Sequence, residues 1–279
     1  RSTVDADPFT NGLAFLFGAT VLREMTGTGP IRSHRVYELA GMSFVLAQCK
    51  SAYLFLPLMM AAIPAARFAS RGHRFGVLTA AVVPGAIASF AYMLALKFTY
   101  FAGIRYVTWA GEVAPDAQTA AILADPLGYV VVLLRSVFTT DLLPTTVLGF
   151  IGIFGPPVYM FFLFYPLIIL TLLGVVLADP QRRGEIAGTT QLLFAGLCAV
   201  STLLLLTLLY LQWTGLGGRV ILGFQGRYLY PLLPMLIAFV PTRQLALLGW
   251  EVRPWFMAHA VLCSSAVLWT TWATYLMKP

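Results

Sequence analysis

The segment 223–234 reads GFQGRYLYPLLP and holds the residues of this chain best suited to bind a phosphate. An arginine guanidinium can grip two phosphate oxygens at once, and Arg227 stands where an apolar run begins. Glycines such as Gly223 and Gly226 let a ligand approach the backbone closely. The candidate site for a lipid-linked phosphate comprises Arg227 with Gln225, Gly226 and Tyr228. The competing interpretation is an arginine that only reaches the headgroup layer, beside tyrosines of the aromatic belt.

Two carboxylates, Asp5 and Asp7, precede the first apolar run of the chain. One interpretation is that they cap the helix that follows and complement its dipole. The other is that one of them assists a reaction as an acid or base, or binds a metal ion. The sequence fixes no cofactor and shows no metal-ligand cluster; the candidate cofactor is a divalent cation, Mg²⁺ or Mn²⁺.

Other polar residues occur singly in or between the apolar runs. The ammonium of Lys50, between two short apolar runs, either reaches water or pairs with an acid or a lipid phosphate. Glu112, Asp116 and Gln118 are either solvated loop residues or parts of an acceptor site. Arg219 is a further cation with the chemistry to contact a phosphate.

The composition requires a membrane. Of the 279 residues, 59% are hydrophobic and 10% are charged, whereas soluble domains carry about 25% charged residues. A lipid bilayer must therefore be the solvent of much of this surface. The net charge of +7 fits basic cytoplasmic loops better than a nucleic-acid partner, because no basic helix has interleaved aromatic residues. The three cysteines lie in or beside apolar runs without CxxC spacing and are interpreted as small buried hydrophobes.

The predicted fold is an all-α integral membrane protein with about eight transmembrane helices in one polytopic domain over residues 1–279. A span needs about 20 apolar residues. The second and third helices are short and turn at Lys50, and Pro84 with Gly85 is expected to kink the fourth. Within the segment 99–156, two short helices are expected to open at Pro115 and at Asp125-Pro126, and the second should lie in the membrane interface. The predicted spans are 8–25, 36–49, 51–67, 75–98, 157–178, 189–212, 228–248 and 255–277.

Arginine is concentrated in four short turns. Residues 23–35, 67–75, 179–189 and 242–254 hold ten of the 18 Lys and Arg. By the positive-inside rule these turns are cytoplasmic. The longer segments 1–7, 99–156 and 213–227 then lie on the outer face. Because long loops carry sites more often than short turns do, functional residues are expected on that face.

Three stretches, taken together, resemble one family. Residues 2–11, STVDADPFTN, are similar to its S-x-D-x entry to a spanning helix. Residues 114–118, APDAQ, followed by DPL at 125–127, resemble its P-x-x-Q…x-P-L pattern. Residues 225–234, QGRYLYPLLP, resemble its QGRY-x-x-P-L-x-P motif, and the order and spacing agree. The family is a set of predicted bacterial polytopic membrane proteins, domain of unknown function 2142, which is grouped with the GT-C glycosyltransferases.

The resemblance implies a GT-C-like fold in the bacterial cytoplasmic membrane and an enzyme of cell-envelope glycan or glycolipid assembly. Such enzymes take a sugar from a polyprenyl-phosphate carrier and pass it to a glycan or lipid acceptor on the outer face. They carry a catalytic acid in the first outer loop. This chain is expected to begin after that region, as the C-terminal part of a longer protein and inactive alone. Asp5 and Asp7 would then be assisting acids, and the catalytic base is unknown.

Two other functions stay open from the sequence. A non-catalytic flippase or export component for envelope glycans would move its substrate without forming a bond. A membrane scaffold predicts no cavity at the outer face. Direct use of ATP is not expected, because there is no Walker A pattern, and the scarcity of ionisable residues in the apolar runs argues against a proton-coupled transporter.

Overall fold

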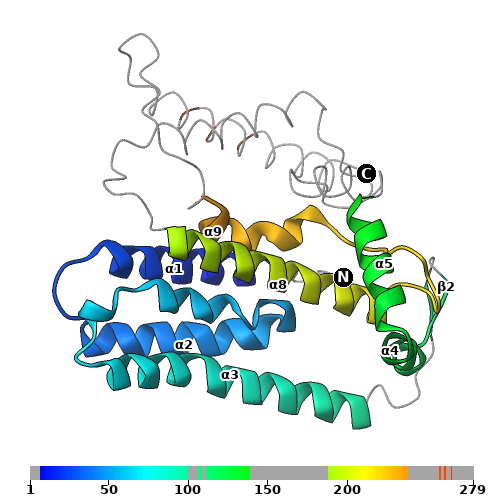
Figure 1. Cartoon of the computed structure of the whole chain (residues 1–279), viewed down its shortest axis with the longest axis horizontal. Coiled ribbons are helices and arrows are strands. Elements are labelled where there is room, and N and C mark those ends of the chain that lie inside the picture. The colour runs from blue at the N-terminus through cyan, green and yellow to red at the C-terminus, as the bar shows by residue number, and fades with distance from the viewer. Residues whose placement is uncertain are drawn as a thin grey trace, which may run out of the picture. The chain divides into compact units, whose positions relative to one another are not determined.

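The computed structural model describes residues 7–99, 106–108, 111–138 and 188–237, together with the single residues Ala258, Val261 and Ser265. The chain divides into two compact units. The first unit comprises residues 1–139, 188–224 and 231–236, and the second comprises 140–187, 225–230 and 237–279. Most of the described residues belong to the first unit, which is a bundle of helices (Figure 1). The predicted spans 157–178 and 255–277 fall outside the described elements.

Helices α1 (Asp7–Thr26) and α2 (Ser33–Cys49) confirm the first two predicted helices to within three residues at each end. The α-helix stops at Lys50, whose backbone is extended with φ −160° and ψ 120°. The turn predicted at this residue is therefore confirmed. Inward-facing side chains of α1 and α2, among them Phe17, Leu39 and Leu46, are fully buried and form part of the core.

The third predicted helix, 51–67, is wrong in kind. It is a run of 3₁₀ segments, η1 (Ser51–Tyr53), η2 (Leu56–Ala62) and η3 (Ala65–Arg67). Pro57 lies in the first turn of η2 and Pro64 directly precedes η3. Because proline lacks an N–H and clashes with the preceding turn, an α-helix cannot run through both positions unbroken. The segment is nevertheless central, since Leu56, Met59 and Met60 are almost completely buried.

Helix α3 (Arg71–Thr99) contains the fourth predicted helix and begins four residues earlier. Its contact with α2 is close at Gly85, where an added Cβ would lie 2.8 Å from the Cβ of Ala47. The side-chain amide of Gln48 donates to the carbonyl of Gly85 at 3.2 Å, and the hydroxyl of Ser89 donates to the carbonyl of Ala47 at 2.5 Å. The two helices are thus joined by polar contacts as well as by packing. The kink predicted at Pro84, which lies inside α3, stays a prediction.

Helix α8 (Gly188–Gln212) confirms the predicted helix 189–212. Among the described residues, two helices are long and apolar enough to cross a membrane, Arg71–Ala95 and Gly188–Gln212. A third crossing is counted if α4 (Pro115–Ala124) and α5 (Pro126–Phe138), which are bent by 110° at their junction, form one broken span. The predicted count of eight spans extends beyond these residues. Helix α2, at 17 residues, is shorter than a typical crossing.

The short helices α4 and α5 confirm the two openings predicted at Pro115 and at Asp125-Pro126. A two-stranded antiparallel hairpin, which the sequence did not reveal, precedes them. Strand β1 (Tyr106–Thr108) pairs with β2 (Gly111–Val113), with Tyr106 opposite Val113. Figure 1 shows β2, α4 and α5 at the end of α3 and α8 that lies away from the α1–α2 turn. In the same view α5 runs across the direction of α3 and α8.

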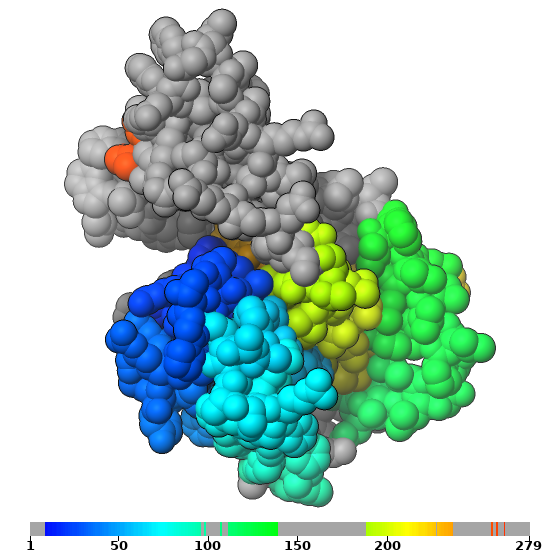
Figure 2. Space-filling view, turned by 60° about the vertical axis from the view of Figure 1, so that its left-hand side comes forward, coloured from blue at the N-terminus to red at the C-terminus, as the bar shows by residue number. Residues whose placement is uncertain are grey.

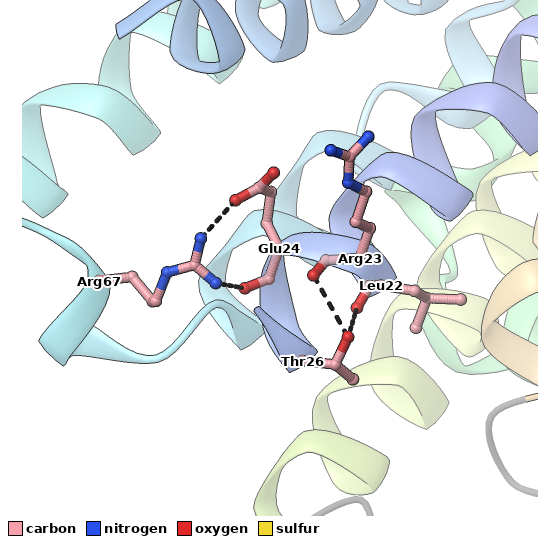
Figure 3. Close-up of polar contacts among 5 residues, drawn as sticks. All are labelled: Leu22, Arg23, Glu24, Thr26 and Arg67. Carbon is pink, nitrogen blue, oxygen red and sulfur yellow. Dashed lines mark hydrogen bonds and ion pairs between the residues drawn. The ribbon is translucent and has the colours of Figure 1, made fainter. Parts of the chain in front are cut away.

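A buried ion pair closes the other end of the bundle (Figure 3). The Arg67 guanidinium donates to the Glu24 carboxylate and to the Glu24 backbone carbonyl, each at 2.7 Å. Both side chains are at most 10% exposed. The carbonyl of Arg67 also accepts the N–H of Ile31 at 2.8 Å. The basic turns 23–35 and 67–75 therefore lie together, as the alternation of charge predicted, and Arg67 satisfies one carbonyl, that of Glu24, in the last turn of α1.

Candidate functional site

A pocket of about 530 Å³ opens between the β-hairpin and the loop that follows α8. Strand β2, which contributes to its lining, lies at the end of the bundle away from the α1–α2 turn (Figure 1). Its lining residues are Gly111 and Glu112 from β2, and Thr214, Gly215, Leu216, Gly217, Gly218, Arg219, Val220 and Leu222 from the loop. We refer to residues 214–222 as the pocket loop.

One carboxylate and one guanidinium line this pocket. Glu112 and Arg219 are both exposed, and the remaining lining residues are glycines, a threonine and three aliphatic residues. A carboxylate accepts hydrogen bonds or a proton, and a guanidinium donates to phosphate oxygens. The bare backbone of Gly215, Gly217 and Gly218 lets a ligand lie against peptide groups without a side chain between. The lining suits a ligand that carries hydroxyl groups and a negative charge.

The pocket loop is held in shape by its own backbone and by β2. The N–H of Leu216 donates to the carbonyl of Glu112 at 2.8 Å, which joins the loop to the hairpin. The Thr214 hydroxyl accepts the N–H of Leu222 at 3.1 Å and so closes the loop. Gly217 has φ +72°, a conformation that side-chain-bearing residues rarely adopt. The loop is therefore a fixed turn, with an ordered path from Thr214 to Leu222.

Gln118, predicted as an outer-loop candidate, lies beneath this loop and not in the pocket. Its side chain is 1% exposed. The amide nitrogen donates to the carbonyl of Tyr210 at 3.0 Å, in the last turn of α8, and more weakly to Gly215 at 3.5 Å. The amide oxygen accepts the N–H of Gly217 at 3.1 Å. Gln118 thus ties α4 to both α8 and the pocket loop, which makes it a residue that positions the pocket.

Helix α5 supports the loop from another side. The Ser136 hydroxyl, which is buried, accepts the N–H of Ile221 at 2.8 Å. At the other end of α5, the Tyr129 hydroxyl donates to the Thr207 hydroxyl of α8 at 2.8 Å, and the Tyr129 and Tyr210 rings lie 5.2 Å apart. Helices α5 and α8 are therefore joined within two turns of the end of α8, and α5 reaches from there to the pocket loop.

Of the residues predicted for the outer loops, the structure brings Glu112 and Arg219 to one pocket. Asp116 is exposed in the first turn of α4 and does not line the pocket. Lys50 is half-buried at the break between α2 and η1. Asp5 lies outside the described residues, and Asp7 is described only as the first residue of α1.

The 225–230 part of the arginine motif belongs to the second unit. The motif begins a 3₁₀ helix, η4 (Gly226–Leu232), in which the N–H of Tyr228 donates to the carbonyl of Gln225 at 3.0 Å. Gln225 is exposed, Gly226 buried and Tyr228 half-buried, while the Arg227 side chain lies outside the described part of the chain. An α-helix was predicted to start near residue 228; it starts instead as α9 (Leu233–Ile237). Pro231 interrupts the α-helical hydrogen bonding just before it.

Gly223 has a different role from the predicted one. The space above its Cα is filled by the indole of Trp213, and an added Cβ would lie 2.2 Å from Trp213 Cδ1. Its φ of +81° also lies in the left-handed region. The glycine therefore allows a tight approach of the chain to a tryptophan rather than to a ligand.

Two structural features were missed by reasoning from the sequence. The hairpin that carries Glu112 has strands of only three residues, too short for an alternating pattern. The Glu24–Arg67 pair joins residues 43 positions apart, and its only local signal is an acid within a basic turn. Among the described residues, no three His, Cys, Asp or Glu side chains gather as a metal site would require.

The sequence model of a family of predicted membrane proteins, DUF2142, matches residues 1–236. The chain belongs to the DUF2142 family. This membership confirms the family that the three motifs predicted. No curated protein and no solved structure matches the chain. The DUF2142 match covers the residues of the hairpin, of the pocket loop and of the 225–234 motif.

Proposed function

We propose that this protein is a membrane glycosyltransferase that takes a sugar from a polyprenyl-phosphate carrier and passes it to a glycan or lipid acceptor at the outer face of the membrane. The observation that carries the proposal is the pocket lined by Glu112 and Arg219 at the end of the bundle remote from the basic turns. The resemblance of residues 225–234 to the arginine motif of GT-C-like proteins points to the same class of substrate.

The charge distribution favours an outward-facing pocket. The basic turns 23–35 and 67–75 meet at one end, where the Ile31 N–H donates to the Arg67 carbonyl. Basic turns of membrane proteins are retained in the cytoplasm. Because α3 and α8 are long enough to cross a bilayer, the end at which α8 meets the pocket loop is then the outer end.

The pocket side chains have the chemistry for sugar transfer from a phosphate. An acceptor hydroxyl oxygen forms a bond to the anomeric carbon, and the bond from that carbon to the phosphate oxygen breaks. The hydroxyl proton passes to the carboxylate of Glu112, and the bonding electrons leave with the phosphate. The guanidinium of Arg219 neutralises the charge that grows on this leaving group, a kind of electrostatic stabilisation that contributes strongly to catalysis. Arg227, which belongs to the other unit, is proposed as a phosphate ligand in its own right, on the sequence grounds alone.

The test is transfer of radiolabelled hexose from polyprenyl phosphate to extracted glycan or lipid, in proteoliposomes that contain the protein as it occurs in its organism. A panel of polyprenyl-phosphate hexoses serves as donors. Removing one charge-stabilising donor from an active site lowers turnover by roughly 100- to 1,000-fold. We expect Arg219→Ala, Arg227→Ala and Glu112→Gln each to show a loss of this order.

Two matched variants serve as controls. Arg135→Ala removes an exposed arginine from the last turn of α5, and Asp116→Asn removes an exposed acid from α4; neither residue lines the pocket. Both should retain transfer. Equal transfer by Arg219→Ala and Arg135→Ala would refute the proposed role of the pocket. Movement of the labelled lipid across the membrane without a new glycosidic bond would indicate an export component instead.

A further inference from the structure

Three exposed arginines at one end of the bundle pair with no acid in the described part of the chain. Each lies at the end or the start of a helix: Arg23 in the last turn of α1, Arg32 before α2 and Arg71 at the start of α3. We call these three residues the arginine face. The segments 23–38 and 64–75 hold six arginines and only two acids, Glu24 and Glu38. This end of the bundle therefore carries an excess of positive charge.

Both acids are already paired within the chain. The carboxylate of Glu24 accepts a hydrogen bond from the buried Arg67 at 2.7 Å, and that of Glu38 pairs with Arg35 inside α2. Arg74, which is half-buried, donates to a backbone carbonyl at 2.6 Å. The arginine face is thus the positive charge that remains after the internal pairs are made, and it is open to an anion from outside.

Arg67 holds the three arginines in one region. Its guanidinium bonds to the residue that follows Arg23, and its carbonyl accepts the N–H of the residue that precedes Arg32. The four residues from Arg67 to Arg71 span at most about 14 Å. Figure 2 brings this end of the molecule forward and shows the α1–α2 turn, in blue, beside the start of α3, in cyan. The arginine face is therefore one local surface.

The direction of α2 and α3 adds to the positive potential at this surface. The two helices run parallel, because Phe44 lies against Gly85, and one turn further along both helices the Ser89 hydroxyl bonds to α2. Both helices begin at this end (Figure 1). The N-terminal end of a helix carries a partial positive charge, so two parallel helices reinforce the charge of the arginines.

The arginine face lies at the depth of lipid headgroups. Arg71 is the first residue of a helix that is long and apolar enough to cross a bilayer. One turn further into that helix Phe75 is 73% exposed, and in the corresponding turn of α2 Tyr37 is 75% exposed. Exposed aromatic residues beside cations are typical of the boundary between hydrocarbon and headgroups. The anion that fits this position is therefore one that is itself anchored in the bilayer.

We propose that the arginine face binds the phosphate headgroup of an anionic phospholipid in the cytoplasmic leaflet. A guanidinium bonds two phosphate oxygens at once. Each arginine near an anionic membrane surface strengthens binding by about fivefold. A bound headgroup anchors the ends of α1, α2 and α3 at a fixed depth in the bilayer. The inference goes beyond the proposed glycosyl transfer and does not depend on it.

The test compares the binding of phosphatidylglycerol and of phosphatidylcholine with the same acyl chains to the full-length protein in detergent. Native mass spectrometry at increasing lipid concentration gives a Kd for each lipid. We expect the wild type to bind phosphatidylglycerol more tightly. Arg32→Gln combined with Arg71→Gln should raise the Kd for phosphatidylglycerol by roughly 25-fold and leave that for phosphatidylcholine unchanged.

Two single variants serve as matched comparisons. Arg135→Gln removes an exposed arginine from the last turn of α5, outside the arginine face, and should leave both Kd values within about twofold of wild type. Glu38→Gln releases Arg35 from its pair and should lower the Kd for phosphatidylglycerol by about fivefold. All the substituted residues are exposed, so melting temperatures in phosphatidylcholine should match that of the wild type.

Three results would overturn the proposal. If the Arg32 and Arg71 double variant kept the wild-type Kd for phosphatidylglycerol, the partner that fits the charge would be an acidic segment of a soluble protein. An equal loss from Arg135→Gln would show an effect of net charge alone. Glycerol phosphate carries the headgroup without acyl chains, and we expect an excess of it to leave phosphatidylglycerol bound. Displacement of the lipid by glycerol phosphate would indicate a site for a free phosphate instead.

Discussion

Replacing Gln118 by methionine should loosen the pocket loop while leaving the helices in place. The side chain keeps its length and fills similar space, but its hydrogen bonds to the Tyr210 carbonyl at 3.0 Å and from the Gly217 N–H at 3.1 Å are lost. A buried polar group that loses its partner costs about 1–3 kcal/mol. The Gly217 N–H is exposed at the pocket and can bond to water instead. We therefore expect the substitution to destabilise the closed loop by about 2–3 kcal/mol in total.

Cleavage by trypsin within the pocket loop measures this change. Arg219 is an exposed trypsin site within the pocket loop, and a protease needs the loop to open before it can cut. When opening is fast relative to cleavage, the rate follows the population of the open form. A loss of about 2–3 kcal/mol then raises cleavage after Arg219 by roughly 30- to 150-fold. The fragment that ends at Arg219 is quantified by mass spectrometry over time.

The matched control is Ala120→Met, which adds the same side chain at an exposed position of α4. It should leave the cleavage rate at Arg219 within about twofold of wild type, as surface substitutions change stability by at most ~0.5 kcal/mol. The reasoning would be refuted if Gln118→Met and Ala120→Met were cleaved at the same rate. Gln118 would then fill space without fixing the loop.

Two further perturbations test the interior. Arg67→Met leaves the Glu24 carboxylate buried without its partner and should lower the free energy of unfolding by about 3–5 kcal/mol. Arg67→Met combined with Glu24→Gln should recover much of that loss. Thermal unfolding in detergent measures both variants, and equal melting temperatures for the two would contradict a stabilising pair. Gly217→Ala meets only backbone strain, about 1–2 kcal/mol, while Gly223→Ala also drives a Cβ into Trp213 and should cost about 2–5 kcal/mol. Equal losses from the two alanine variants would show that the contact with Trp213 is unimportant.

Helices α1, α3, α4, α5 and α8 were predictable because each rests on a local signal. Long apolar runs gave α1, α3 and α8, and proline at the first helical position gave α4 and α5. The segment 51–67 was also recognised as apolar, but apolarity does not distinguish an α-helix from a 3₁₀ helix. Pro57 and Pro64 do distinguish them, because proline interrupts the hydrogen bonding of an α-helix.

The site was predictable only in part. Loop length and charge predicted functional residues in the segments that contain Glu112 and Arg219, which line one pocket. The role of Gln118 was hidden because its partners are backbone groups more than 90 positions away, and any residue type supplies such groups. A sequence pattern shows which side chains are present, but it does not show which backbone carbonyl lies beside the Gln118 amide in the folded chain. The family predicted from the three motifs is confirmed by the match over residues 1–236, while the phosphate-binding role of the arginine motif stays a prediction.

The 3₁₀ run between Ser51 and Arg67 is fully covered only after α8 has been synthesised. Peptide groups in hydrocarbon must be bonded or covered by other protein. In this structure α8 contacts η1 and η2, yet α8 begins at Gly188, more than 120 residues later in synthesis than η2. A nascent chain that ends before α8 therefore holds an incompletely covered segment, and we expect it to stay bound to the insertion machinery or to be degraded. We expect the bundle to leave the insertion machinery only after α8 has packed against η1 and η2.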